Sequence, residues 1–253
     1  MTRVDVAKYC LIFVVVSIVM VLGVGCALAQ PESFLELIDE PGSREAYVAL
    51  EILAVLTLLS LAPALVITVT SFTRIIIVLS FLRSALGTQQ LPPNQVIIGM
   101  ALFLTFFVMA PVGQQINDLA LQPYLAEEIS LSEAATRGIS PLRDFMFSFT
   151  REKDLEVFVE LAGIGELWDQ DDVPTHVLVP AFMISELRTA FQLGFLLFIP
   201  FLVIDIIVAS TLMSMGMMML PPVIISLPFK ILLFVLADGW NLVIRSLLMT
   251  YQR

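Results

Sequence analysis

The sequence predicts an all-α membrane protein, and three observations lead to this fold class. Of the 253 residues, 58% are hydrophobic and only 14% are charged, whereas soluble domains are roughly 45–50% apolar. Three stretches carry no charged residue: 52–73, 84–117 and 206–229. Each is long enough for a helix that crosses a bilayer core, which takes about 20 residues. Prolines inside apolar runs, such as Pro63, remove a backbone donor, so we expect long kinked helices.

The first 29 residues predict a secretory signal peptide. Basic residues precede an apolar run over 11–22, and Ala27-Leu-Ala29 forms a small-x-small cleavage site. An uncleaved anchor is the alternative interpretation. Both cysteines, Cys10 and Cys26, lie in this segment. The cleaved chain would therefore contain no disulfide, no thiolate metal ligand and no cysteine nucleophile.

Residues 30–112 are expected to form a first apolar helical hairpin. Its turn lies at 84–94, where Gly87 and two prolines interrupt the apolar pattern, and Pro111 to Gly113 is expected to end the second helix. Arg74 lies inside an apolar run, where a charge usually faces protein or water. Snorkelling to an interface is the alternative for Arg74 and for Arg83.

Residues 113–180 are expected to form an acidic, helical region in the periplasm. Between 117 and 180 there are 13 acidic residues against four basic ones, which accounts for most of the net charge of -10. Interleaved aromatic residues predict short amphipathic helices. The acidic balance excludes nucleic-acid binding, which selects basic surfaces.

No cofactor, metal site or catalytic residue is predicted. The run Asp169-Gln-Asp-Asp172 could bind a cation, but it lacks the Gly and Glu spacing of a calcium loop, and a solvated acidic surface is favoured. His176 is the only histidine, and one histidine does not make a zinc site. We find no nucleophile–base constellation, so an intramembrane enzyme is disfavoured.

Residues 181–253 are expected to form a second apolar helical hairpin. Charged side chains within it normally pair or face a water-filled space. We expect either Glu186 or Asp205 to pair with Lys230, within or between subunits. A proton relay is the alternative function for these charges.

The two helices of this hairpin are joined by a Met-rich loop, Met213–Pro222. Five of the 12 methionines fall here, and thioethers on flexible chains adapt to many shapes. Gly216 gives backbone freedom, and the pair Pro221-Pro222 prevents a helix from running through. The loop could seal a pore and yield to cargo, or it could be ordinary packing at a helix corner. The residues of the candidate gasket are Met213, Met215, Met217, Met218 and Met219.

Several long motifs resemble the FliP/SctR family of type III secretion export-gate proteins, in particular its flagellar branch. They are Thr70-Ser-Phe-Thr-Arg-Ile75, Leu86-Gly-Thr-Gln-Gln-Leu-Pro-Pro-Asn94, the run from Phe198 to Pro222, Ser226-Leu-Pro-Phe-Lys230 and Asp238-Gly-Trp240. The resemblance covers most of residues 50 to 250. An injectisome-type gate subunit is similar but matches less closely.

The resemblance implies a non-enzymatic subunit of the flagellar export gate, in the bacterial inner membrane at the flagellar basal body. It implies five copies of the chain with FliQ and FliR, joined by FlhB and FlhA, and unfolded flagellar substrates as cargo. It further implies helical hairpins wound into a helical oligomeric stack, much of it raised toward the periplasm, so that apolar segments need not all span the bilayer. The methionine gasket of the family maps onto the Met-rich loop.

The competing function is a Met-lined small-solute transporter. The most specific form of this alternative is a Cu(I) transporter, because clustered thioethers are soft copper ligands. Against it, the methionines lie between apolar segments and not on an exposed tail.

Overall fold

A computed structural model of the chain is built from helices, and the part of it that is described contains no strand. The described residues are 44–88, 91–164, 170–217 and 220–252. The predicted all-α fold class is therefore confirmed. The chain divides into two compact units, Met1–Ala62 and Pro63–Arg253. The predicted signal peptide lies outside the described residues.

The first unit contains the N-terminal part of helix α3 (Arg44–Val69), which enters the second unit at Pro63. Apolar side chains of this part, including Val48, Ile52 and Leu56, are about half exposed within the chain. Pro63 does not end the helix. An all-round apolar helix of this kind is typical of a lipid or subunit contact.

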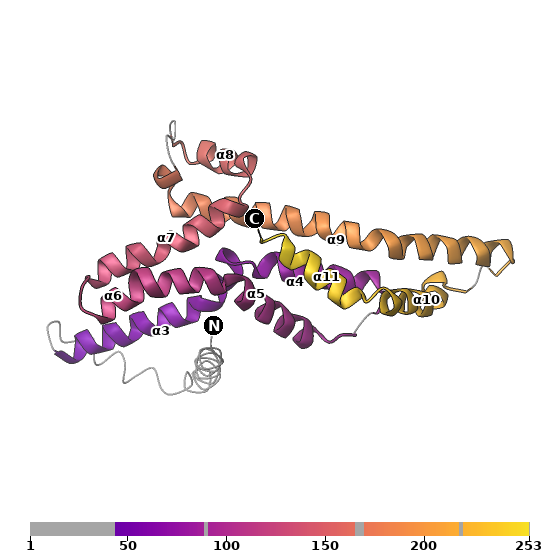
Figure 1. The fold of residues 1–253 in the computed structure, drawn as a ribbon, viewed down its shortest axis with the longest axis horizontal. Coiled ribbons are helices and arrows are strands. Elements are labelled where there is room, and N and C mark those ends of the chain that lie inside the picture. The colour runs from indigo at the N-terminus through magenta and orange to yellow at the C-terminus, as the bar shows by residue number, and fades with distance from the viewer. Residues whose placement is uncertain (1–43, 89–90, 165–169, 218–219, 253) are drawn as a thin grey trace. The chain divides into compact units, whose positions relative to one another are not determined.

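The core of the second unit is organised around α4 (Phe72–Ala85), whose inner face is the most buried surface of the described chain. Ile75 and Leu82 are almost inaccessible to solvent. Two neighbouring helices cover this face, α5 (Asn94–Ile116) and α9 (Thr175–Ser214) (Figure 1). Where α4 and α9 are closest, a Cβ on Gly194 would lie 2.6 Å from the Phe81 ring, so glycine permits this approach.

The prediction that Pro111 to Gly113 ends the second apolar helix was wrong. Helix α5 runs through Pro111 and continues into a π-helical turn, η1 (Asn117–Leu121), and α6 (Gln122–Leu125). A proline removes only one intrahelical hydrogen bond, and neighbouring helices can stabilise the kinked segment. The helical body therefore crosses the expected boundary at residue 112.

The acidic region folds into two amphipathic helices, α7 (Leu131–Phe149) and α8 (Glu152–Leu161), and a short 3₁₀ turn. The Ser130 hydroxyl accepts a hydrogen bond from the Glu133 backbone N–H at 3.3 Å, which caps the start of α7. The inner faces of both helices pack on the first turns of α9. This second core contains Val112, Phe145, Met146, Val173, Val177, Leu178 and Phe182.

The C-terminal part consists of α9, which begins before residue 181, and two shorter helices, α10 (Pro222–Leu236) and α11 (Gly239–Met249). The axes of α10 and α11 differ by 65°. At the bend, Asp238 takes a left-handed conformation with φ 49°. Within this unit, the turn between α9 and α10 lies at the end of α9 remote from α7 and α8 (Figure 1).

Two helical segments in the described part are long and apolar enough to cross a membrane, Asn94–Leu125 and Thr175–Ser214. The number rises to four if the bent pairs α3–α4 and α10–α11 each count as one span. Only 11% of the apolar window in Thr175–Ser214 is buried inside the chain. Most of the surface of this window therefore needs lipid or another chain to cover it.

Candidate pore loop and buried charge clusters

The Met-rich loop begins with a Schellman motif at the end of α9. The Met217 N–H donates to the Leu212 carbonyl at 3.0 Å, and the Gly216 N–H donates to the Met213 carbonyl at 3.1 Å. Gly216 has φ +76°, the left-handed conformation that this motif requires and that glycine adopts without a Cβ penalty. Gly216 therefore provides the left-handed residue that terminates the 40-residue helix α9.

The three described methionines of the loop are exposed within the chain. The side chains of Met213, Met215 and Met217 are 57%, 65% and 37% exposed. Met218 and Met219 lie outside the described residues. The sealing role and the packing role that the sequence allows for this loop therefore both stay predictions.

The two prolines at the end of the loop also start the next helix. Pro221 is the N-cap of α10 and Pro222 is its first residue. Proline suits this position because its fixed φ is helical and the first N–H of a helix has no intrahelical acceptor. The loop therefore lies between a well-defined C-terminus of α9 at Gly216 and a well-defined N-terminus of α10 at Pro221.

The first buried charge cluster joins α9, α10 and α4 around Lys230. The Lys230 ammonium donates to Asp205 Oδ2 at 2.6 Å and to the Ala85 carbonyl at 3.2 Å. Ala85 is the last residue of α4, so the cation also neutralises the negative end of that helix. The Ser226 hydroxyl donates to the second carboxylate oxygen of Asp205 at 2.5 Å.

The second cluster lies near the start of α4 and contains Glu186. Arg74 binds both of its carboxylate oxygens, with Nε 3.0 Å from Oε2 and Nη2 on Oε1. The pair is almost completely buried. A bidentate guanidinium–carboxylate pair is strong and directional. Within the chain, Glu186 therefore pairs with Arg74, and of the two carboxylates expected for Lys230 it is Asp205 that lies beside it.

The C-terminal residues complete the Arg74–Glu186 cluster. The Tyr251 hydroxyl donates to Glu186 Oε2 at 2.7 Å, and the Thr250 hydroxyl accepts from Arg74 Nη1 at 3.0 Å. The Arg74 guanidinium lies 4.2 Å from the Tyr251 ring centroid, which Phe149 contacts edge-on. Burial raises the pKa of the Tyr251 phenol well above its ordinary value, and the nearby Glu186 carboxylate acts in the same direction. The phenol is therefore a neutral donor.

Sequence reasoning did not identify Tyr251, Thr250 or Ser226 as partners of the buried charges. Ser226 lies four residues before Lys230 on one helix face, so helical spacing could have suggested it. Tyr251 lies 65 residues from Glu186 along the chain. No local pattern links two positions so far apart.

The described part of the chain contains no group of three His, Cys, Asp or Glu side chains that could hold a metal ion. His176 is an exposed residue in the first turn of α9. Asp172 ends the short turn η2, while Asp169 lies outside the described residues.

These features define a class of protein: a helical membrane component whose described buried charges are paired and whose long helices expose apolar surface and are joined by a methionine-rich turn. Comparison with known proteins then gives the family. The model of the FliP family matches residues 55–247. The chain belongs to the FliP family and is a component of the flagellar type III export gate.

Similar proteins from distant bacteria support this membership over most of the chain. The flagellar biosynthetic protein FliP of Bacillus subtilis is 54% identical over 218 residues, covering 86% of this chain and 99% of the relative. FliP of Caulobacter vibrioides is 47% identical over 249 residues, 98% of this chain and 93% of the relative. FliP of Aquifex aeolicus is 53% identical over 206 residues, 81% and 86% respectively.

Proposed function

We propose that this chain is a pore-forming, structural subunit of the flagellar type III export gate. In this role it passes unfolded flagellar substrates across the inner membrane and is needed for flagellum assembly. The observation that carries the proposal is the exposure of Met213, Met215 and Met217 on a turn fixed between two helix ends.

The proposed assembly contains five copies of the chain with FliQ and FliR, and it contacts FlhB and FlhA. It lies in the inner membrane at the flagellar basal body, with the acidic helices α7 and α8 on the periplasmic side. The exposed apolar surface of α9 supports an assembly, because one copy alone leaves it uncovered. We assign no catalytic residue, since transport needs a shaped and sealed conduit from this chain and no bond chemistry.

The proposed seal depends on the mechanics of the loop. Copies of the loop converge on one axis, and their thioethers fill the lumen against water and ions. A passing substrate displaces the side chains, which change rotamer and close again because Met is unbranched and has three rotatable bonds. The Schellman motif at Gly216 keeps the backbone in place while the side chains move.

The test replaces Met213, Met215 and Met217 together by Ala and measures ion leakage through assembled gates in intact cells. We expect leakage in the Ala variant, because shortened side chains leave the lumen open. A Met→Leu triple variant is the matched control: it keeps apolar volume but is branched and stiffer, so it should seal at rest and export more slowly. An assembled Ala variant that does not leak would overturn the sealing role.

A further inference from the structure

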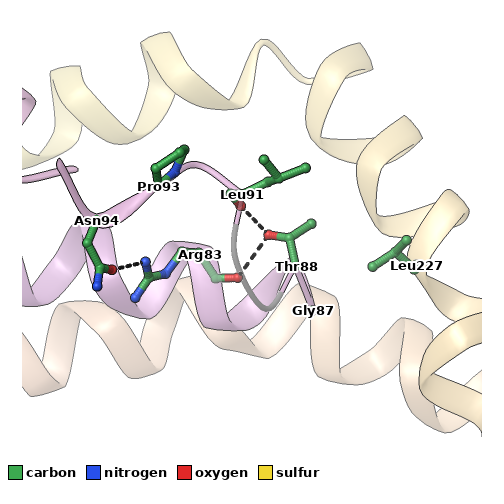
Figure 2. A pocket seen from close by; sticks show the side chains of 7 residues that line it. All are labelled: Arg83, Gly87, Thr88, Leu91, Pro93, Asn94 and Leu227. Atoms are coloured by element: carbon green, nitrogen blue, oxygen red, sulfur yellow. Dashed lines mark hydrogen bonds between the residues drawn. The ribbon is translucent and has the colours of Figure 1, made fainter. Parts of the chain in front are cut away.

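The turn between α4 and α5 contains an open pocket that the proposed function does not use. Its volume is about 990 Å³. Figure 2 shows its lining, which comes from the end of α4, the start of α5 and one residue of α10. The lining residues are Arg83, Gly87, Thr88, Leu91, Pro93, Asn94 and Leu227.

Arg83 is the charged residue among the described lining of this pocket, and no acidic side chain of the described residues pairs with it. Its Nη1 donates to the amide oxygen of Asn94, and none of the ion pairs among the described residues includes it. Between Arg74 and Asp118 it is the only charged residue in the sequence. A guanidinium carries five N–H donors, so this single hydrogen bond leaves most of them open.

In contrast to Arg83, the two buried cations among the described residues each have a carboxylate partner. Arg74 is held by the carboxylate of Glu186, and Lys230 by that of Asp205. Although Lys230 lies close to Gly87, its charge is already balanced. Among the described residues that line it, the pocket therefore has a net positive charge from Arg83. The Thr88 hydroxyl donates to the Leu91 carbonyl at 2.5 Å and is thus used within the turn (Figure 2).

Other groups in the pocket suit an anion that is attached to an apolar body. The N-cap of α5 is Pro93, which makes no side-chain capping bond, so the positive end of the helix dipole at Asn94 adds to the field of Arg83. Leu91 is 67% exposed at the rim, and Leu227 lies on the facing helix. Polar groups thus lie beside Arg83 and apolar surface lies next to them.

The place of the pocket in the fold indicates the source of the anion. It lies where α4, part of a bent candidate span, ends and where the candidate span Asn94–Leu125 begins. Ends of spanning helices lie at the level of lipid headgroups, where basic pockets between helices bind anionic headgroups. We propose that this pocket binds the phosphodiester of an anionic phospholipid through Arg83, with the amide of Asn94 as a neutral hydrogen-bonding group.

The experiment measures lipid retained by the detergent-extracted complex containing this chain, by native mass spectrometry. The complex is exposed to phosphatidylglycerol, to the zwitterionic phosphatidylethanolamine, and to inorganic phosphate alone. We expect preferential retention of phosphatidylglycerol and a loss of about tenfold in Arg83→Gln, the usual size of one charge-assisted contact. Arg188→Gln, which removes an exposed arginine of α9 outside the pocket, is the matched control and should retain the lipid.

A second variant keeps the proposal testable if Arg83→Gln does not assemble. Asn94→Asp places a carboxylate on the atom that Arg83 already contacts, so it should neutralise the pocket and lose the lipid while the turn is kept. Equal retention of phosphatidylglycerol by Asn94→Asp and the unmodified chain would overturn the proposal. Arg83-dependent binding of inorganic phosphate without retained phospholipid would overturn the lipid assignment.

Discussion

Each buried cation in this protein is also a connector between helices. Lys230 on α10 contacts a carboxylate on α9 and the terminal carbonyl of α4. Arg74 on α4 contacts α9 and the C-terminal residues. An ion buried without its partner is costly, so each pair ties three elements in one arrangement. Between them, the two clusters fix α4 at both ends.

The Lys230–Asp205 pair predicts a compensating double substitution. Lys230→Met alone strands a carboxylate and should cost about 3 kcal/mol, the lower end for a broken buried pair because Asp205 remains partly exposed. Asp205→Asn alone should cost a similar amount. The double variant should fall within about 1 kcal/mol of the unmodified chain, because no unpaired charge remains. Thermal unfolding of the detergent-extracted protein measures these differences.

The exposed pair Arg137–Glu133 on α7 is the control for this series, since both side chains are about half exposed. Arg137→Met should change stability by less than about 0.5 kcal/mol. Combining Lys230→Met with Glu186→Gln should bring no compensation within the chain, because Glu186 is bound by Arg74. Compensation there, and none with Asp205, would contradict the pairing that we describe.

At this scale the sequence indicated which charges need partners but could not choose between them. The apolar surroundings of Arg74, Glu186, Asp205 and Lys230 made pairing an expectation. Arg74 and Glu186 are 112 residues apart, so only the packing of α4 on α9 brings them together. The contribution of Tyr251 depends in the same way on where α11 ends.

At the scale of elements, close packing at the α10–α11 corner depends on one glycine. A Cβ on Gly239 would lie 2.2 Å from carbons of the Phe234 ring. That ring is buried and contacts both Phe201 and Trp240, at centroid distances of 6.4 and 5.4 Å. The ring cannot move away without disturbing two aromatic contacts, so the corner has no room for a methyl group.

We therefore predict that Gly239→Ala destabilises the protein by about 1–3 kcal/mol through overpacking. Gly99 on α5 is the matched control, because a Cβ there meets no atom within 4 Å. Gly99→Ala should be neutral or stabilising by up to about 1 kcal/mol, since alanine favours helix more than glycine does. Thermal unfolding of both variants tests this, and equal losses of stability would contradict the packing argument.

Elements were predicted best where local chemistry determines them. Gly216 and the pair Pro221-Pro222 marked the Met-rich turn because their backbone preferences are strong. The end of α5 was predicted too early. The helix runs through Pro111 and continues into η1. Proline is a reliable stop in water, but an apolar environment offers the chain no better alternative than continuing the helix.

At the scale of the whole molecule, exposed apolar surface is the dominant property. Large side chains on different helices are more than 60% exposed in the isolated chain, among them Phe103, Phe107, Phe195, Leu196 and Leu236. Soluble monomers rarely expose contiguous apolar patches of such extent. The chain therefore requires lipid, further copies or other gate proteins around it.

We predict that the protein extracted in mild detergent runs as one large particle with several copies of this chain, five in the proposed assembly. Mass photometry of the particle and its rotational symmetry in electron micrographs measure the copy number. The Met→Ala triple variant should form the same particle, because its side chains do not contribute to the described core clusters. A monodisperse single chain with all helices in one detergent belt would contradict the proposed assembly.

The length of α9 sets a limit on how the protein lies in its membrane. Forty residues at 1.5 Å rise extend about 60 Å, roughly twice the thickness of a bilayer's hydrocarbon layer. Upright, or at the usual helix tilts of up to about 40°, such a rod must extend past the hydrocarbon layer on at least one side. The first turns of α9 are covered by α7 and α8 of the same chain, and apolar surface elsewhere beyond the lipid needs other protein around it. Any arrangement of the gate must therefore place protein, and not water, around the apolar part of α9 that extends beyond the lipid.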